Sequence, residues 1–170
     1  MRLLALIGAL AILVAIAAAV FFLGGFYSVA ATEKDPGVVN WALVQVRNAS
    51  IARHATEAPP TALDDPKTVK AGAKAFATLG CANCHGTPGV DNSWAKFSEG
   101  MEPIAADLNE VAKELTPAQV FWVVKNGIKM TGMPSFGANA PDPEIWTIAA
   151  FVNKWPSVKP EDYKTWTATQ

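Results

Sequence analysis

The five residues Cys81-Ala82-Asn83-Cys84-His85 constrain this chain more than any other segment, because they have the spacing C-x-x-C-H. At this spacing two thiols can bond to the two vinyl groups of one haem, and the adjacent histidine can reach the haem iron. The two cysteines are the only ones in the chain, so no thiol remains for a disulfide or a second haem of this kind. The motif therefore predicts one covalently bound haem c.

Two other kinds of site use a C-x-x-C pair, namely thioredoxin-type redox sites and zinc sites. Zinc needs four ligands, and the chain has no second cysteine pair and only one further histidine, His54. A thioredoxin-type site follows a strand rich in Val and Ile, whereas residues 70–79 have a helical pattern. Haem attachment is the interpretation that both observations favour.

The N-terminal segment is apolar and uncharged from Leu3 to Leu23. As a helix this run is long enough to cross the hydrocarbon core of a bilayer. Arg2 lies on its outer flank, which predicts that this end stays in the cytoplasm and the rest of the chain emerges on the other side. A cleaved signal peptide is the alternative, but its apolar core has only about 7–15 residues. We expect an uncleaved transmembrane anchor over residues 1–31.

Residues 32–66 form a second part, with an amphipathic helix over 38–55 and an extended, proline-rich linker over 56–66. The apolar side of this helix is a stripe of four residues: Trp41, Val44, Ile51 and Ala55. Three candidates could cover it, namely the membrane surface, a partner subunit and the haem domain.

Residues 67–170 have the pattern of a domain in which helices are joined by long loops. Proline at the first helical position and capping residues mark the helix starts, and no segment has the pattern of a strand. The fold class is therefore predicted to be all-α. Four helices are expected: Lys67 to Leu79, a short one within Ala105 to Leu115, one that Thr116 and Pro117 open, and a final one from Glu144 to Trp155.

Over residues 67–155 this domain resembles the class I c-type cytochromes. In that family the attachment motif follows the first helix, and a methionine from a distant loop completes the coordination of the iron. The loop over 127–137 contains Met133-Pro134, which is similar to the family's ligand loop. Two further pairs match the family's crossing of the two terminal helices: Gly72 with Phe76, and Ile148 with Phe151.

The resemblance implies that Cys81 and Cys84 bind the haem and that His85 and Met133 are the axial ligands of the iron. Met130 is the main competitor for the sixth position, but Pro134 stiffens the loop next to Met133 and favours the latter. Three other residues are expected to have roles other than iron ligation. Met130 is expected to be a packing residue, Met101 a core or haem-edge contact, and His54 a solvated helix residue.

The second ring nitrogen of His85 is expected to donate a hydrogen bond to a backbone carbonyl, in the loops that contain Pro88 or Pro103. Some side chains are candidate donors to the haem propionates: Trp94, Trp122, Asn126 and Tyr163.

With two strong axial ligands the iron has no open position, so we expect an electron carrier and not an enzyme. The resemblance implies a haem domain on the periplasmic side of the bacterial inner membrane. Expected partners are a dehydrogenase, a quinol-oxidising complex or a terminal oxidase, and the chain could be a permanent subunit of such a complex. The alternative function is a haem enzyme or gas-binding sensor with an open or labile sixth position.

Charge says little about the partner. Residues 67–170 carry ten Lys and ten Asp or Glu, and no basic run indicates nucleic acid binding. Lys125 and Lys129 flank the ligand loop and are a candidate docking pair for an acidic partner, although an ordinary solvated pair is the simpler interpretation.

Overall fold

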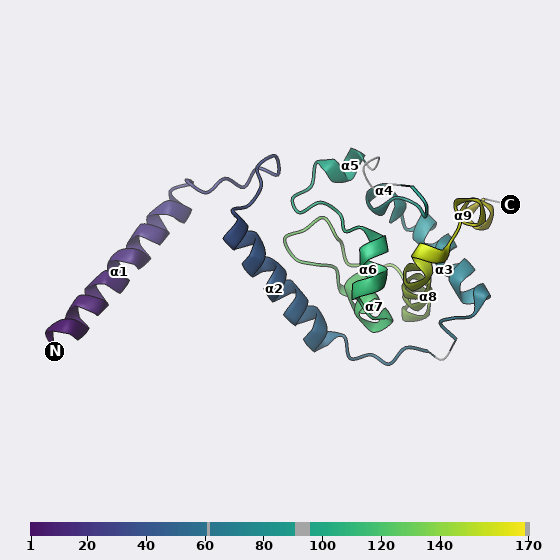
Figure 1. The fold of residues 1–170 in the computed structure, drawn as a ribbon, viewed down its shortest axis with the longest axis horizontal. Coiled ribbons are helices and arrows are strands. Elements are labelled where there is room, and N and C mark those ends of the chain that lie inside the picture. Colours follow the sequence, from purple (N-terminus) through teal and green to yellow (C-terminus); the bar gives the residue numbers. More distant parts are fainter. Residues whose placement is uncertain (61, 91–95, 169–170) are drawn as a thin grey trace. The chain divides into compact units, whose positions relative to one another are not determined.

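The computed structural model describes the chain except for residues 61, 91–95 and 169–170. Contacts divide the chain into two compact units, Met1–Glu33 and Lys34–Gln170. The described residues form α-helices and one 3-10 helix, without a strand, as the sequence predicts (Figure 1).

The first unit contains α1 (Arg2–Leu23), a helix of 22 residues. None of its residues is buried within the chain. At about 1.5 Å per residue the helix is about 33 Å long, close to the thickness of a bilayer's hydrocarbon core. In the part of the chain that the structure describes, α1 is the one helix that length and composition allow to span a membrane. This agrees with the apolar run seen in the sequence.

The second unit contains the remaining helices, and capping explains where several of them begin. The Asp65 carboxylate accepts a hydrogen bond from the Lys67 amide (2.8 Å) at the start of α3. Thr116 and Gln119 form a reciprocal capping box at the start of α7. The helices of this unit are α2 (Gly37–His54), α3 (Pro66–Thr78), α4 (Ala82–His85), α5 (Lys96–Glu99), α6 (Leu108–Glu114), α7 (Pro117–Asn126), α8 (Asp142–Lys154), η2 (Trp155–Ser157) and α9 (Pro160–Thr167).

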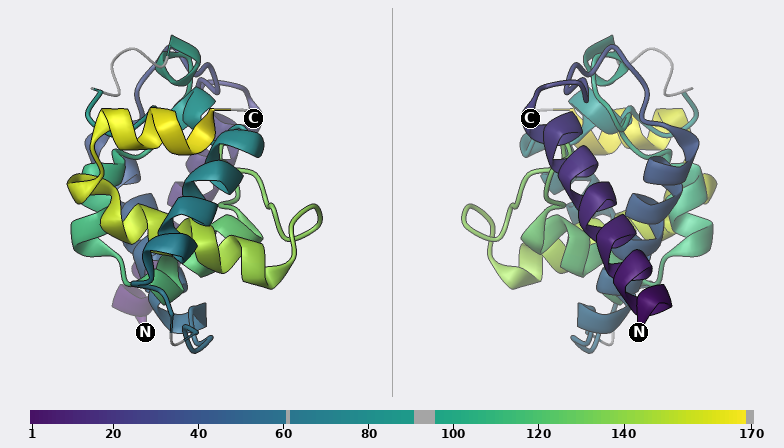
Figure 2. Two further views of the ribbon diagram at one scale, coloured as in Figure 1. Left: turned by 90° about the vertical axis from the view of Figure 1, so that its right-hand side faces the viewer. Right: turned by 90° about the vertical axis from the view of Figure 1, so that its left-hand side faces the viewer.

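The crossing of α3 and α8 is the largest helix contact in this unit, and Figure 2 shows the two helices across each other. At Gly72 a Cβ atom would collide with the carbonyl oxygen of Thr147 and would lie 2.8 Å from Cβ of Phe151. The Phe76 and Phe151 rings meet edge to face, with centroids 5.4 Å apart. The prediction that glycine lets these helices approach and that aromatic rings fill the crossing is therefore confirmed.

Trp146 is a second large aromatic residue of α8. Its ring stacks on Phe121 of α7, with centroids 4.1 Å apart. Both residues are buried. Trp146 therefore joins α8 to α7, while Phe151 joins α8 to α3.

The C-terminal end of α2 packs against α7. Ile51 is only 4% exposed, and the His54 ring stacks on Trp122 of α7 with centroids 5.9 Å apart. Trp41, about three turns closer to the N-terminus than Ile51, is 63% exposed. The domain thus covers one end of the predicted apolar stripe and leaves the other end exposed.

Among the described residues, the sequence interpretation missed the helices α4, α5 and α9. It ended the last helix at Trp155, because Pro156 follows it. The chain instead turns through η2 and begins a new helix at Pro160, where Glu161 and Asp162 in the first turn favour helix formation. Tyr163 on α9 is buried and Trp166 packs against the core, so two aromatic side chains hold this short helix on the domain.

Candidate functional site

The C-x-x-C-H motif lies on α4, which follows α3 after a tight turn. Gly80 has a positive φ of 79°, and the Cys81 amide donates a hydrogen bond back to the carbonyl of Phe76 (3.1 Å). The His85 amide donates to the carbonyl of Cys81 (2.9 Å), which closes one helical turn. Both cysteines are free and half-buried. Because they are three residues apart in a helical turn, the two thiols lie on the same side of it.

The imidazole of His85 is held by the backbone of a distant loop. Its Nδ1 lies 2.9 Å from the carbonyl oxygen of Ala106. Burial lowers the pKa of His85, and the Ala106 hydrogen bond offsets part of this effect. Since a carbonyl only accepts, Nδ1 carries the proton and Nε2 of the neutral ring is free to bind a metal.

The backbone acceptor for His85 was expected, but its position was only partly correct. The carbonyl belongs to Ala106, three residues after Pro103, and not to the loop that contains Pro88. Pro88 is instead fully buried in its own turn. No sequence signal marks Ala106, because any residue has a backbone carbonyl.

The loop over 127–137 is closed at its base by backbone hydrogen bonds. The Ile128 amide donates to the carbonyl of Met133 (3.1 Å). The Thr131 hydroxyl donates to the carbonyl of Ile128 (2.8 Å) and accepts from the Met133 amide (3.1 Å). These bonds fix the backbone on both sides of the Met133 side chain.

The second half of this loop is tied to the end of α7. The amides of Phe136 and Gly137 donate to the carbonyls of Val124 and Lys125, each at 3.0 Å. The Ser135 hydroxyl also donates to the carbonyl of Lys125 (2.7 Å). Gly127 has a positive φ of 68°, and a Cβ there would lie 2.9 Å from the Met133 carbonyl oxygen. The loop therefore returns closely along the helix that precedes it.

The two methionines of the loop have opposite environments. Met130 is 96% exposed and has a positive φ of 59°. Met133 is half-buried and packs against the hydrophobic core. A third methionine, Met101, is half-buried, and its sulfur lies 2.6 Å from the position of a Cβ at Gly132. Met133 is thus partly sheltered from solvent and Met130 is not, and the proximity of Met101 to this loop was not expected from the sequence.

The other histidine lies in a different environment. His54 is exposed at the end of α2, and its Nδ1 is 2.8 Å from the carbonyl oxygen of Ser50. Its ring stacks on Trp122. His54 is thus exposed to solvent, whereas His85 is half-buried.

Burial also changes the acidity of two groups next to the motif. It raises the pKa of the Cys81 thiol to about 11, with a smaller contribution from Cys84. It also raises the pKa of Tyr163, and a smaller electrostatic effect of Cys81 adds to this shift. Both groups are therefore poorly solvated.

The candidate propionate donors lie on two helices, with Trp122 and Asn126 on α7 and Tyr163 on α9. Asn126 donates through Nδ2 to the carbonyl of Trp122 (2.9 Å). Trp94 lies outside the described residues. The role of these side chains at the propionates stays a prediction.

The residues present fit a covalently held haem. Two free thiols lie on one helical turn, a neutral imidazole with a free Nε2 follows them, and a half-buried thioether is available on a separate loop. Cys81 and Met133 both pack against the same hydrophobic core. Within the described ranges, no three His, Cys, Asp or Glu side chains gather as they would in a zinc site.

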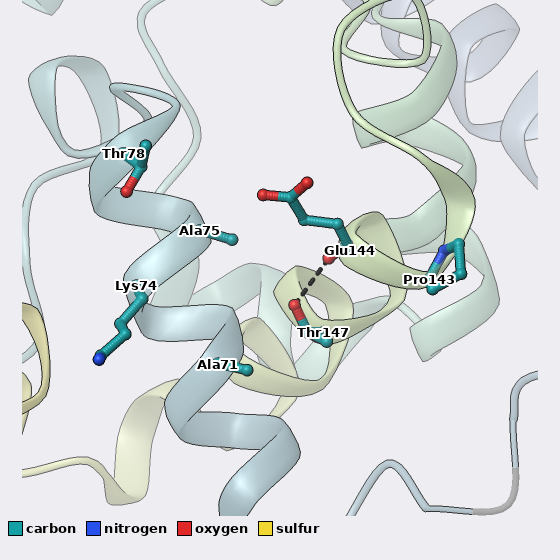
Figure 3. A pocket seen from close by; sticks show the side chains of 7 residues that line it. All are labelled: Ala71, Lys74, Ala75, Thr78, Pro143, Glu144 and Thr147. Atoms are coloured by element: carbon teal, nitrogen blue, oxygen red, sulfur yellow. Dashed lines mark hydrogen bonds between the residues drawn. The ribbon is translucent and has the colours of Figure 1, made fainter.

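A surface pocket of about 430 Å³ lies elsewhere, between α3 and α8. Figure 3 shows its side chains, with the Thr147 hydroxyl donating to the carbonyl of Glu144 (2.7 Å). None of the candidate haem residues lines it. The lining residues are Ala71, Lys74, Ala75, Thr78, Pro143, Glu144 and Thr147.

Comparison with known families supports the fit. Residues 67–152 match the family described as cytochrome c oxidase, cbb3-type, subunit III. Comparisons with curated proteins and with solved structures gave no match. The match covers α3, the motif, the ligand loop and most of α8, and domains of this family bind haem c covalently and transfer electrons. The chain therefore belongs to the family of cbb3-type cytochrome c oxidase subunit III, and its domain is a class I c-type cytochrome.

Proposed function

We propose that this protein is a membrane-tethered carrier of single electrons with one covalent haem c. Cys81 and Cys84 form the two thioether bonds to the haem. His85 and Met133 are the axial ligands of the iron. The haem supplies the one-electron couple of its iron, and the protein supplies its attachment, its ligands and its surroundings.

The observation that carries this proposal is the hydrogen bond between Nδ1 of His85 and the carbonyl of Ala106. It selects the tautomer and holds the ring directly after the two thiols, so Nε2 is the nitrogen left for iron. Such second-shell bonds also increase the basicity of the ligand. A histidine with a merely structural role would not need a free nitrogen beside two unpaired thiols.

The thioether of Met133 determines the class of chemistry in this proposal. A soft thioether favours ferrous iron over ferric iron and raises the reduction potential relative to a second histidine. With His85 and Met133 both bound, the chain leaves no iron position for oxygen, peroxide or a substrate. The protein then transfers electrons and is not itself the enzyme.

The membrane tether is the part of the proposal that rests on α1. We assign residues 1–31 to the anchor, 32–66 to the second helix and linker, and 67–170 to the haem domain. Arg2 at the start of α1 favours a cytoplasmic N-terminus. The haem domain is then on the periplasmic side of a bacterial inner membrane.

The partners proposed are membrane-bound redox proteins, and the family favours a terminal oxidase as the electron acceptor. A dehydrogenase or a quinol-oxidising complex would be the donor. Lys125 is already engaged, because it pairs with Asp142 (2.8 Å) and lies over the Phe121 ring. Lys129 is exposed and is the more available cation for docking. Purification in mild detergent, followed by identification of the proteins that accompany the chain, tests the partner assignment.

A visible spectrum of the purified full-length protein tests the ligand assignment. We expect a low-spin spectrum with a weak far-red band in the oxidised state, which indicates sulfur ligation, and no rapid binding of carbon monoxide in the reduced state. High-spin features together with rapid carbon monoxide binding would contradict the proposal. They would indicate a haem enzyme or gas sensor with an open sixth position.

A further inference from the structure

The helix α9 is an addition to the matched domain. The family match ends at residue 152, and α9 begins at Pro160. It packs against α3, the helix that directly precedes the attachment motif, and Figure 2 shows α9 beside that helix. A segment outside the matched range therefore contacts the helix that leads into the attachment motif.

The first contact joins α9 to the turn after the motif. Gly89 has a positive φ of 75°, and a Cβ atom there would collide with the ring of Pro160. The start of α9 is thus in close contact with the backbone four residues after His85. Any side chain at position 89 would push the helix away.

The second contact is made by Tyr163. Its side chain is 7% exposed, and its ring stacks on Phe151 with centroids 5.8 Å apart. Tyr163 and Cys81 pack against the same hydrophobic core. One turn further on, Trp166 packs against this core as well. Tyr163 is therefore the buried residue that attaches α9 to the core on which Cys81 also packs.

We propose that α9 is a cover over the attachment site, and that Tyr163 is a positioning residue that keeps water away from Cys81 and thereby raises the reduction potential of the haem. This inference rests on the proposed attachment of haem at Cys81. Ferric haem carries one more positive charge than ferrous haem, and water stabilises the more highly charged form. Exclusion of water at this side consequently favours the ferrous state.

The test is a spectroelectrochemical titration of the full-length holoprotein and its variants in detergent. Tyr163→Ala is expected to shift the ferric/ferrous equilibrium about tenfold toward the ferric state, which is about 59 mV for one electron. Tyr163→Phe retains the ring and is expected to keep the wild-type potential. Gly89→Ala displaces Pro160 and should shift the equilibrium in the same direction as Tyr163→Ala.

The matched control is Thr165→Ala, because Thr165 is exposed on the same helix and its hydroxyl donates to the Glu161 carbonyl within that helix (2.8 Å). Its potential should not change. If Tyr163→Ala retains haem and its wild-type potential while its melting temperature falls, α9 only stabilises the fold and the inference is overturned. Should Tyr163→Ala not accumulate, Tyr163→Leu is expected to give a smaller shift of the same sign. Wild-type protein without covalent haem would instead refute the proposed function, so the two failures are distinguishable.

Discussion

The attachment segment (residues 80–86) and the ligand loop (residues 127–137) hold their candidate residues by different means. The attachment segment is a helical turn directly after α3, and α3 itself crosses α8 and packs against α9. The ligand loop has no helix of its own and is tied to the end of α7 by backbone hydrogen bonds and one serine hydroxyl. The first segment depends on packed side chains, whereas the second depends on hydrogen bonds at the surface. We therefore expect the attachment segment with His85 to be rigid and the ligand loop with Met133 to open more easily.

The largest expected effect concerns the thiols of the attachment segment. The double variant Cys81→Ser, Cys84→Ser is expected to lose all covalent haem, because neither side chain can then form a thioether. Haem that remains with the denatured polypeptide is the quantity to measure. His54→Ala changes the other histidine and should retain the full haem content. Covalent haem in the double variant would contradict attachment of the haem at these two cysteines.

The next effect concerns the ligand loop. Met133→Ala should remove the far-red sulfur band and lower the reduction potential by on the order of 0.1 V or more, because the iron loses its thioether ligand. Met130 is 96% exposed, so Met130→Ala should change neither the band nor the potential. Absorption spectra and redox titrations of both variants check this. Loss of the band in Met130→Ala alone would reverse the assignment.

A smaller effect is expected at the base of the attachment segment. Gly72→Ala places a methyl group against the Thr147 carbonyl and should lower the free energy of unfolding by about 3 kcal/mol, because the two helices must separate. Denaturant unfolding of the holoprotein measures it. Gly100→Ala is the control, since a Cβ there would be 3.7 Å from its nearest neighbour. Equal stability of both variants would argue that the crossing is not tightly packed.

The smallest effect tests whether hydrogen bonds hold the methionine side closed. Ser135→Ala removes the bond to the Lys125 carbonyl, which contributes about 1 kcal/mol. We expect external imidazole to displace Met133 about fivefold more readily, measured as the change in its binding constant. Ser157→Ala removes a bond of the same kind and length, to the Lys154 carbonyl, outside the loop. It should leave imidazole binding unchanged, and an equal change in both variants would remove the distinction between the two segments.

The features that the sequence predicted are those encoded by spacing and local chemistry. Helix starts at Asp65-Pro66 and Thr116-Pro117 follow from capping and proline. The place of Gly72 beside α8 was implied by the resemblance to the class I c-type cytochromes. The acceptor at Ala106 could not be located, because it is a backbone group in an irregular loop. The helix α9 was missed because Pro156 appeared to end the helical region. Its stability comes from tertiary contacts of Tyr163 and not from a long helical pattern.

The mass of the wild-type protein purified from its native membrane, measured after denaturation and followed by peptide mapping, tests the central claim most directly. We predict a chain heavier than its polypeptide by one haem, with the added mass on the peptide that contains Cys81 and Cys84. A chain with the mass of the polypeptide alone, and both thiols unmodified, would contradict it.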